Sequence, residues 1–131
     1  MRSLARAITG LEFVERIVDT SVPNCLVHAT NGDVGRIDLL EEQFGVVGSA
    51  FPDVTVAFEG HLLSEDRFVS QFVLSGTHRG QLGIAPPTGR RLESTGAIVG
   101  RVDMAGRAME LWVYLAPGMG LLFPRGDRPR E

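Results

Sequence analysis

The stretch FPDVTVAFEGHLLSEDRFVSQFVLSGTHRGQLGIAPPTGRR, residues 51–91, decides the fold class, because here the hydrophobic pattern changes from helical to strand-like. It contains two strand-like runs, 54–63 and 67–78, separated by a turn at Ser64–Asp66. Two more runs, 91–102 and 107–116, follow, with a turn at Met104–Gly106 between them. Four long strands connected in this way predict an antiparallel sheet.

The residues before this stretch predict helices. Thr9 and Glu12 have the T-x-x-E spacing of a capping box, so a helix is expected from about Gly10 to Asp19, with Pro23 as its stop signal. A short helix over residues 4–8 is expected ahead of it, capped by Ser3.

A short strand over residues 25–29 and a second, longer helix are expected next. Asp33 is placed to cap a helix from about Val34 to Ala50, in which apolar side chains recur every three or four residues. Helices followed by long strands predict an α+β fold, with the helices packed on one face of a curved antiparallel sheet.

Length and composition indicate one globular domain over residues 1–131, with a flexible tail over about 124–131. The chain is 44% hydrophobic and 22% charged. No apolar run approaches the roughly 20 residues of a membrane helix, and the N-terminus lacks the apolar core of a signal peptide. We therefore expect a cytoplasmic protein with no membrane association.

Charged residues exclude several kinds of chemistry. The net charge is −3 and no basic face is evident, so no nucleic-acid partner is expected. All 13 basic residues are Arg, which rules out a Schiff-base lysine and a P-loop lysine. The lone Cys25 and the three histidines lack the spacing of a metal site, so no metal is expected.

Strand alternation predicts a partly polar pocket beside the last strand. Glu110, Trp112, Tyr114 and Ala116 share one side of this run, while its other side is wholly apolar. An acid with two aromatic rings suits a small-molecule pocket, in which the rings would contact a flat substrate. Gln71, from the polar side of the run 67–78, is a further candidate substrate contact.

Several motifs at these spacings resemble the SnoaL-like polyketide cyclase family over roughly residues 24–123. The motifs are Phe51-Pro52-Asp53, Asp66-Arg67, Gly76-Thr77-His78, Pro86-Pro87-Thr88-Gly89, and Glu110 with Trp112. The resemblance implies a cone-shaped α+β barrel, as in scytalone dehydratase and nuclear-transport-factor-like proteins, paired into homodimers through the sheet. It also implies a small hydrophobic, polyketide-like substrate and ring closure by an aldol condensation without metal or cofactor.

One residue departs from the family pattern. In the aldol cyclases of this family, an Asp four residues after the Trp acts as general acid and base. Ala116 occupies that position here, so the resemblance does not supply the carboxylate of an aldol cyclase.

Other titratable residues are left as candidate catalytic groups. Glu110 is a candidate pocket acid if it is buried beside Trp112, since burial raises the pKa of a carboxyl group. Arg101 and Asp103 form an R-x-D pair, and epoxide hydrolases of the limonene type, on the same barrel, use an Arg between carboxylates. Alternatively, Asp103 opens a turn and Arg101 pairs with Glu110 across the hairpin. A two-residue turn would place Arg101 and Asp103 on the face of Trp112, whereas a three-residue turn with a bulge at Gly106 would reverse this.

Two histidines complete the candidate site. His28 stands where family members often carry a pocket histidine, and it could bind or protonate a substrate oxygen together with Asn31. Alternatively, Asn31 belongs to a turn and His28 packs within a strand. His78 is either a substrate contact or a structural hydrogen-bonding residue.

Three functions remain open on this basis. The first is a cofactor-independent cyclase or isomerase that tailors a polyketide in a bacterial biosynthetic pathway. The second is an epoxide hydrolase or epoxide-opening cyclase. The third is a non-catalytic accessory protein that binds a small molecule.

Overall fold

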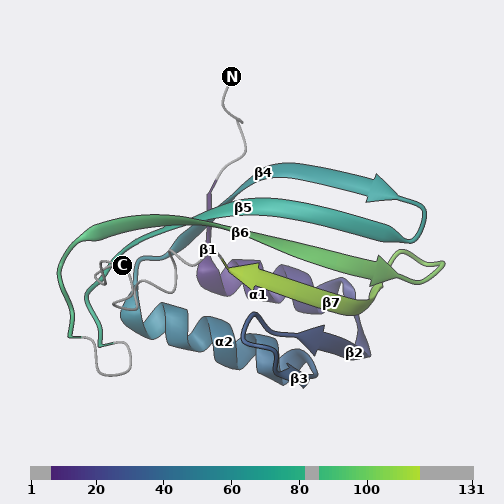
Figure 1. Cartoon of the computed structure of the whole chain (residues 1–131), viewed down its shortest axis with the longest axis horizontal. Coiled ribbons are helices and arrows are strands. Elements are labelled where there is room, and N and C mark those ends of the chain that lie inside the picture. Colours follow the sequence, from purple (N-terminus) through teal and green to yellow (C-terminus); the bar gives the residue numbers. More distant parts are fainter. Residues whose placement is uncertain (1–6, 82–85, 116–131) are drawn as a thin grey trace, which may run out of the picture.

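The computed structural model describes residues 7–81 and 86–115. The elements in chain order are β1 (Ile8–Thr9), α1 (Gly10–Asp19), β2 (Ser21–His28), β3 (Val34–Gly35), α2 (Ile37–Ala50), β4 (Thr55–Ser64), β5 (Arg67–Thr77), β6 (Arg91–Val102) and β7 (Ala108–Leu115). The strands form one sheet in the order β1-β4-β5-β6-β7-β2-β3. β4, β5 and β6 curve over the two helices (Figure 1). The α+β class is confirmed, with a sheet that is strongly curled but not closed.

The first long helix has the predicted bounds and cap. Thr9 Oγ1 accepts a hydrogen bond from the Glu12 amide at 3.0 Å, which satisfies one of the free amides of the first turn. The helix ends at Asp19, and Pro23 lies inside β2 and does not form the helix stop. The short helix expected over residues 4–8 is wrong at Ala7, which is not helical, and at Ile8, which belongs to β1; residues 4–6 lie outside the described part.

Strand β2 is longer than predicted and pairs in parallel with β7, whereas the other pairings of the sheet are antiparallel. Its register with β7 is irregular between Ser21 and Leu26, where Pro23 has no amide hydrogen to donate. Beyond this irregularity, His28 lies beside Trp112.

The second helix begins later than predicted, at Ile37, although its predicted end at Ala50 is confirmed. The expected cap at Asp33 is wrong because residues 34–35 form β3, which pairs with Val27 and His28. Asp33 instead lies in a turn, where its amide donates to Asn31 Oδ1 at 3.0 Å.

The core lies between the helices and the inner face of the sheet. Phe13 of α1 is 1% exposed, and its ring centroid lies 5.1 Å from that of Phe44 and 5.2 Å from that of Phe72. Leu111 and Val113 of β7 are buried on this inner face. The predicted alternation along β5 and β7 is therefore confirmed, and the inner face is the one that the helices cover.

Candidate active site

A cavity of about 550 Å³ lies inside the curled sheet, toward the end that carries the β4–β5 and β6–β7 hairpins. Inner-face side chains of four strands line it, together with α1. They include Phe58, His61, Phe68, Ser70, Ile98 and Leu111. A mostly apolar cavity with a few polar groups is the usual form of a small-molecule site.

A β-bulge in β4 brings His61 into this cavity. Phe58 pairs with Phe72, but the next pair is Gly60 with Gln71, so Glu59 is the extra residue of the bulge. His61 then pairs with Ser70, which is buried on the inner face. Strict alternation from Phe58 would have placed His61 on the outer face.

His61 and Ser70 form a hydrogen-bonded pair in the lining of the cavity. Nδ1 of His61 lies 2.7 Å from Oγ of Ser70, and the imidazole stacks on the Phe68 ring at a centroid distance of 6.0 Å. These contacts fix both the position and the plane of the imidazole. His61 is exposed while it lines the cavity, so a ligand can reach its imidazole. An imidazole placed in this way can transfer a proton to a substrate oxygen or polarise it.

Asp103 also lines this cavity, at the β6–β7 hairpin. Its Oδ1 accepts hydrogen bonds from the amides of Ala105 and Arg107, both at 2.9 Å. The hydrogen bond from the Arg107 amide is the main cause that lowers the pKa of Asp103, and the Arg107 charge adds to it. This carboxylate is therefore ionised at neutral pH and opens the turn.

The hairpin combines features of both predicted registers. Asp103 pairs with Arg107 around a three-residue turn, and Gly106 adopts a φ of +82°. A register shift after this turn restores the pairing of Arg101 with Glu110. Arg101 and Asp103 are therefore directed to different partners, and the arrangement of an Arg between two carboxylates is not present here.

Three of the predicted catalytic residues meet on the outer face of the sheet, away from the helices. Glu110 Oε2 accepts a hydrogen bond from His28 Nε2 at 2.7 Å, and Glu110 Oε1 accepts from Arg101 at 3.3 Å. The His28 ring stacks on Trp112 with a centroid distance of 4.8 Å, and the Arg67 guanidinium lies 5.6 Å from the centre of the Trp112 ring. We call these five residues the outer-face cluster.

The electrostatics of the outer-face cluster favour an ionised carboxylate. The hydrogen bond from His28 is the main cause that lowers the pKa of Glu110, and the bond and charge of Arg101 act in the same direction. Because Glu110 is then an acceptor bound on both oxygens, it is unsuited to donate a proton. The cluster connects β2, β7, β6 and β5 across the sheet.

The other predicted substrate contacts lie apart from the cavity. Tyr114 and Gln71 are exposed on the outer face, where they line a shallow depression with Glu59. Asn31 is part of the turn before β3. Ala116 lies outside the described residues.

His78 is a buried structural contact beside the end of α2. Its ring is 3% exposed and stacks on Phe51 at a centroid distance of 5.3 Å, and Nδ1 lies 3.2 Å from Thr88 Oγ1. Nε2 has no hydrogen-bond partner within the described residues. His78 is not among the residues that line the cavity of His61.

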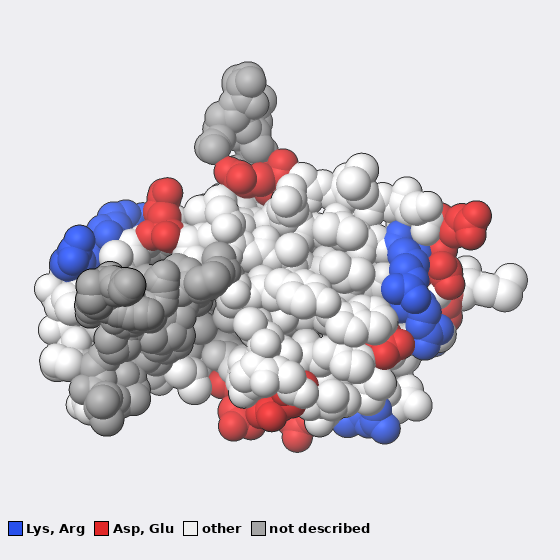
Figure 2. All heavy atoms as spheres, viewed as in Figure 1, with Lys and Arg blue, Asp and Glu red and all other residues white. Residues whose placement is uncertain are grey.

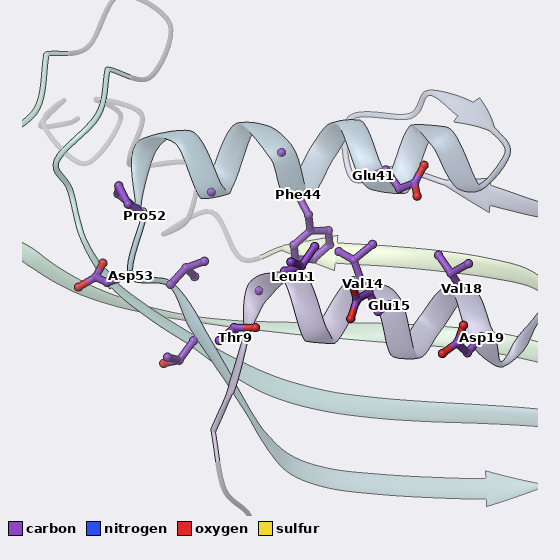
Figure 3. Close-up of a pocket in the computed structure, with 15 residues that line it drawn as sticks. Thr9, Leu11, Val14, Glu15, Val18, Asp19, Glu41, Phe44, Pro52 and Asp53 are labelled. Atoms are coloured by element: carbon purple, nitrogen blue, oxygen red, sulfur yellow. The ribbon is translucent and has the colours of Figure 1, made fainter.

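A second hollow of about 820 Å³ lies between α1 and α2 (Figure 3). Leu11, Val14 and Phe44 form its apolar part, and its titratable groups are carboxylates such as Glu15 and Glu41. These carboxylates are exposed to solvent. The hollow lacks a histidine or a buried hydroxyl, so the cavity of His61 is the better equipped of the two for acid–base chemistry.

Metal-ligand groups, membrane-length helices and surface charge complete the description of these residues. Among residues 7–81 and 86–115, no three His, Cys, Asp or Glu side chains are grouped to hold a metal ion. Within the same ranges, no helix has the length and apolar character needed to cross a membrane. Acidic and basic side chains lie next to each other at the hairpin end, and much of the viewed face is uncharged (Figure 2).

Sequence reasoning overlooked His61, although one signal for it was present. Glycine inside a strand often marks a bulge, and Gly60 stands between Glu59 and His61. A bulge there would have predicted that His61 shares the face of Phe58. No local pattern predicts Ser70 as the partner of His61, because this contact joins residues of two different strands.

Solved structures with the same fold include several proteins described as cyclases. The candidate hydroxylase AclR from Streptomyces galilaeus superposes with a TM-score of 0.73 at 20% identity, covering 90% of this chain and 73% of that chain. The candidate polyketide cyclase IdmH from Streptomyces antibioticus has a TM-score of 0.72 at 22% identity, covering 86% of this chain and 87% of that chain. A SnoaL-like protein from Jannaschia sp. CCS1 has a TM-score of 0.71 at 17% identity, covering 89% of this chain and 81% of that chain.

The family assignment comes from the sequence. No curated protein matches the chain significantly. A family model, however, matches residues 5–116, which is most of the chain and includes the helices, the curled sheet and the cavity described above. The chain therefore belongs to the SnoaL-like polyketide cyclase family.

Proposed function

We propose that this protein is a cofactor-independent enzyme of the cyclase or isomerase type, which tailors a polyketide-like intermediate in the cavity of His61. Membership of the SnoaL-like family supports a role in polyketide tailoring. The observation that carries the proposal is the His61–Ser70 pair at the cavity, in which Nδ1 of the exposed His61 lies 2.7 Å from Oγ of the buried Ser70. This pair offers acid–base chemistry to a substrate that binds against the apolar side chains of the cavity.

The proposed roles divide between two residues of the cavity. His61 contacts the substrate oxygen on which charge develops, and the ionised Asp103 at the hairpin end is the candidate base. Ala116 stands where the family's aldol cyclases have their Asp, so we propose a rearrangement or ring closure that does not use that carboxylate. His28, Arg101 and Glu110 support the sheet in this scheme.

Deuterium exchange into 2-acetonaphthone tests the proposal. This aromatic methyl ketone is a simple probe for catalysed enolisation, and mass spectrometry in D₂O measures the exchange of its methyl hydrogens. We expect the wild-type protein to accelerate exchange and His61→Gln to lower the rate about 100-fold or more. His28→Gln is the matched control, because it makes the same change in the outer-face cluster.

Two outcomes would contradict the assignment. Full activity in His61→Gln with loss in His28→Gln would move the chemistry to the outer-face cluster. Binding of the ketone without any exchange, unaffected by His61→Gln or Asp103→Asn, would favour a non-catalytic binding protein. The epoxide-opening alternative has less support, since Arg101 bonds to Glu110.

We also propose that the protein works as a homodimer in the cytoplasm. The outer face of the sheet carries exposed apolar side chains, among them Leu62 of β4 and Tyr114 of β7, and Trp112 is half-buried on the same face. Pairing of two sheets through this face would cover them. Sedimentation equilibrium of the wild-type chain and of Leu62→Glu measures the association directly.

A further inference from the structure

The Ser70 hydroxyl limits the ways in which the His61 imidazole can carry its proton. A serine hydroxyl has one proton to donate, and a neutral imidazole has one N–H donor and one acceptor nitrogen. Ser70 is 8% exposed, and within the described residues His61 Nδ1 is the hydrogen-bond partner of its Oγ. The proton between the two groups can therefore belong to either of them.

These two arrangements differ in what they leave unsatisfied. If Nδ1–H donates to Ser70 Oγ, the serine proton has no acceptor among the described residues, which is unfavourable for a buried donor. If Ser70 O–H donates to Nδ1, both groups are satisfied. The remaining imidazole proton then sits on Nε2, the ring nitrogen that has no partner within the described residues.

We propose that Ser70 is a positioning residue that holds neutral His61 as the Nε2–H tautomer, so that His61 donates a hydrogen bond to an oxygen of the substrate. This inference rests on the proposed function and specifies its chemistry. The bound group is an oxygen that gains negative charge during the reaction, and a ketone carbonyl next to the reacting carbon is such a group. A neutral imidazole can polarise a carbonyl in this way.

The stacking of His61 on Phe68 supports this role. The two rings are 25° from parallel at a centroid distance of 6.0 Å, which restricts the swing of the imidazole about its side chain. The hydrogen bond to Ser70 fixes the remaining choice, namely which nitrogen is presented to a ligand. Under this scheme His61 does not abstract the carbon-bound proton, because its available nitrogen is a donor.

Nitrogen-15 NMR of protein labelled at histidine tests the inference without any substrate. The three histidines are assigned with His28→Gln and His78→Gln, and spectra are recorded at a pH where His61 is neutral. We expect a protonated-type shift for His61 Nε2 and an unprotonated-type shift for Nδ1. A proton found mainly on Nδ1 of the wild-type protein would overturn the inference.

Ser70→Ala and Ser70→Thr extend the test. Alanine removes the donor, so the tautomer preference should fall about tenfold, whereas threonine keeps the hydroxyl and should retain it. In the 2-acetonaphthone assay, Ser70→Ala should lower kcat about tenfold with little change in KM. An unchanged tautomer ratio in Ser70→Ala would refute the positioning role, while loss of exchange in His61→Gln would still uphold the proposed function.

Discussion

Gly100→Ala should move the aromatic wall of the cavity. Gly100 of β6 lies opposite Phe68 of β5, and a Cβ atom added there would lie 2.1 Å from Phe68 Cε2 and 2.3 Å from Cζ. Ordinary contacts begin at 3.4 Å, so the Phe68 ring would have to retreat by about 1.3 Å, the difference between 3.4 and 2.1 Å. Because His61 stacks on this ring, the imidazole would move with it.

The expected cost follows from overpacking. Extra methyl groups in a packed interior cost about 1–3 kcal/mol, and each kcal/mol lowers Tm by a few degrees in a chain of this size. Phe68→Leu in the Gly100→Ala background should recover most of the loss, because the smaller side chain vacates the space that the new methyl group needs. Affinity for 2-acetonaphthone should fall with Gly100→Ala and return in part in the double variant.

Urea unfolding of the single and double variants measures the energetic coupling between positions 100 and 68. Gly45→Ala is the control: it adds the same methyl group in α2, where nothing beyond its chain neighbours and the backbone of the helix lies within 4 Å, and should stabilise the protein by about 0.5–1 kcal/mol. If Gly100→Ala unfolds at the wild-type urea concentration, or if its cost is the same with leucine at position 68, the argument from close contact is refuted.

Two further predictions concern the scaffold. Thr9→Ala removes the side-chain acceptor for the Glu12 amide and should cost about 1 kcal/mol in urea unfolding, whereas Thr9→Ser should be near neutral. Glu110 has a lowered pKa in the folded state, so its contribution to stability is present above the ordinary carboxyl pKa and is lost as pH falls through the folded value. Urea midpoints measured from about pH 7 down to about pH 3 should therefore fall more steeply for wild type than for Glu110→Gln, and parallel curves would exclude this contribution.

The sequence predicted correctly those element boundaries that depend on residues close together in the chain. The capping box at Thr9 fixed the start of α1, and the turn residues at Ser64–Asp66 and Met104–Gly106 separated the long strands correctly. The end of α2 at Ala50 was equally clear, because Pro52 follows it. Each of these features depends on residues within a few positions of one another.

Features that depend on distant pairing were missed. Asp33 had the expected chemistry of a helix cap, but pairing of the next two residues with β2 delays the helix to Ile37. The pairing of Arg101 with Glu110 was one of the two predicted arrangements. The three-residue turn was expected to prevent it, and the register shift between Arg101 and Val102 that restores it was not foreseen. The alternation of Glu110 and Trp112 was right, and the apolar side of this strand does face the helices, but the cavity of His61 also lies on that apolar side.

The bulge in β4 also affects how this chain should be aligned with its relatives. Between Phe58 and Gly60 the strand contains one residue more than its neighbour β5. An ungapped alignment with a relative that lacks the extra residue would match His61 to an outward-facing position of that relative. At identities near 20%, cavity residues of this family are therefore better compared from superposed strands, with a one-residue gap allowed at Glu59.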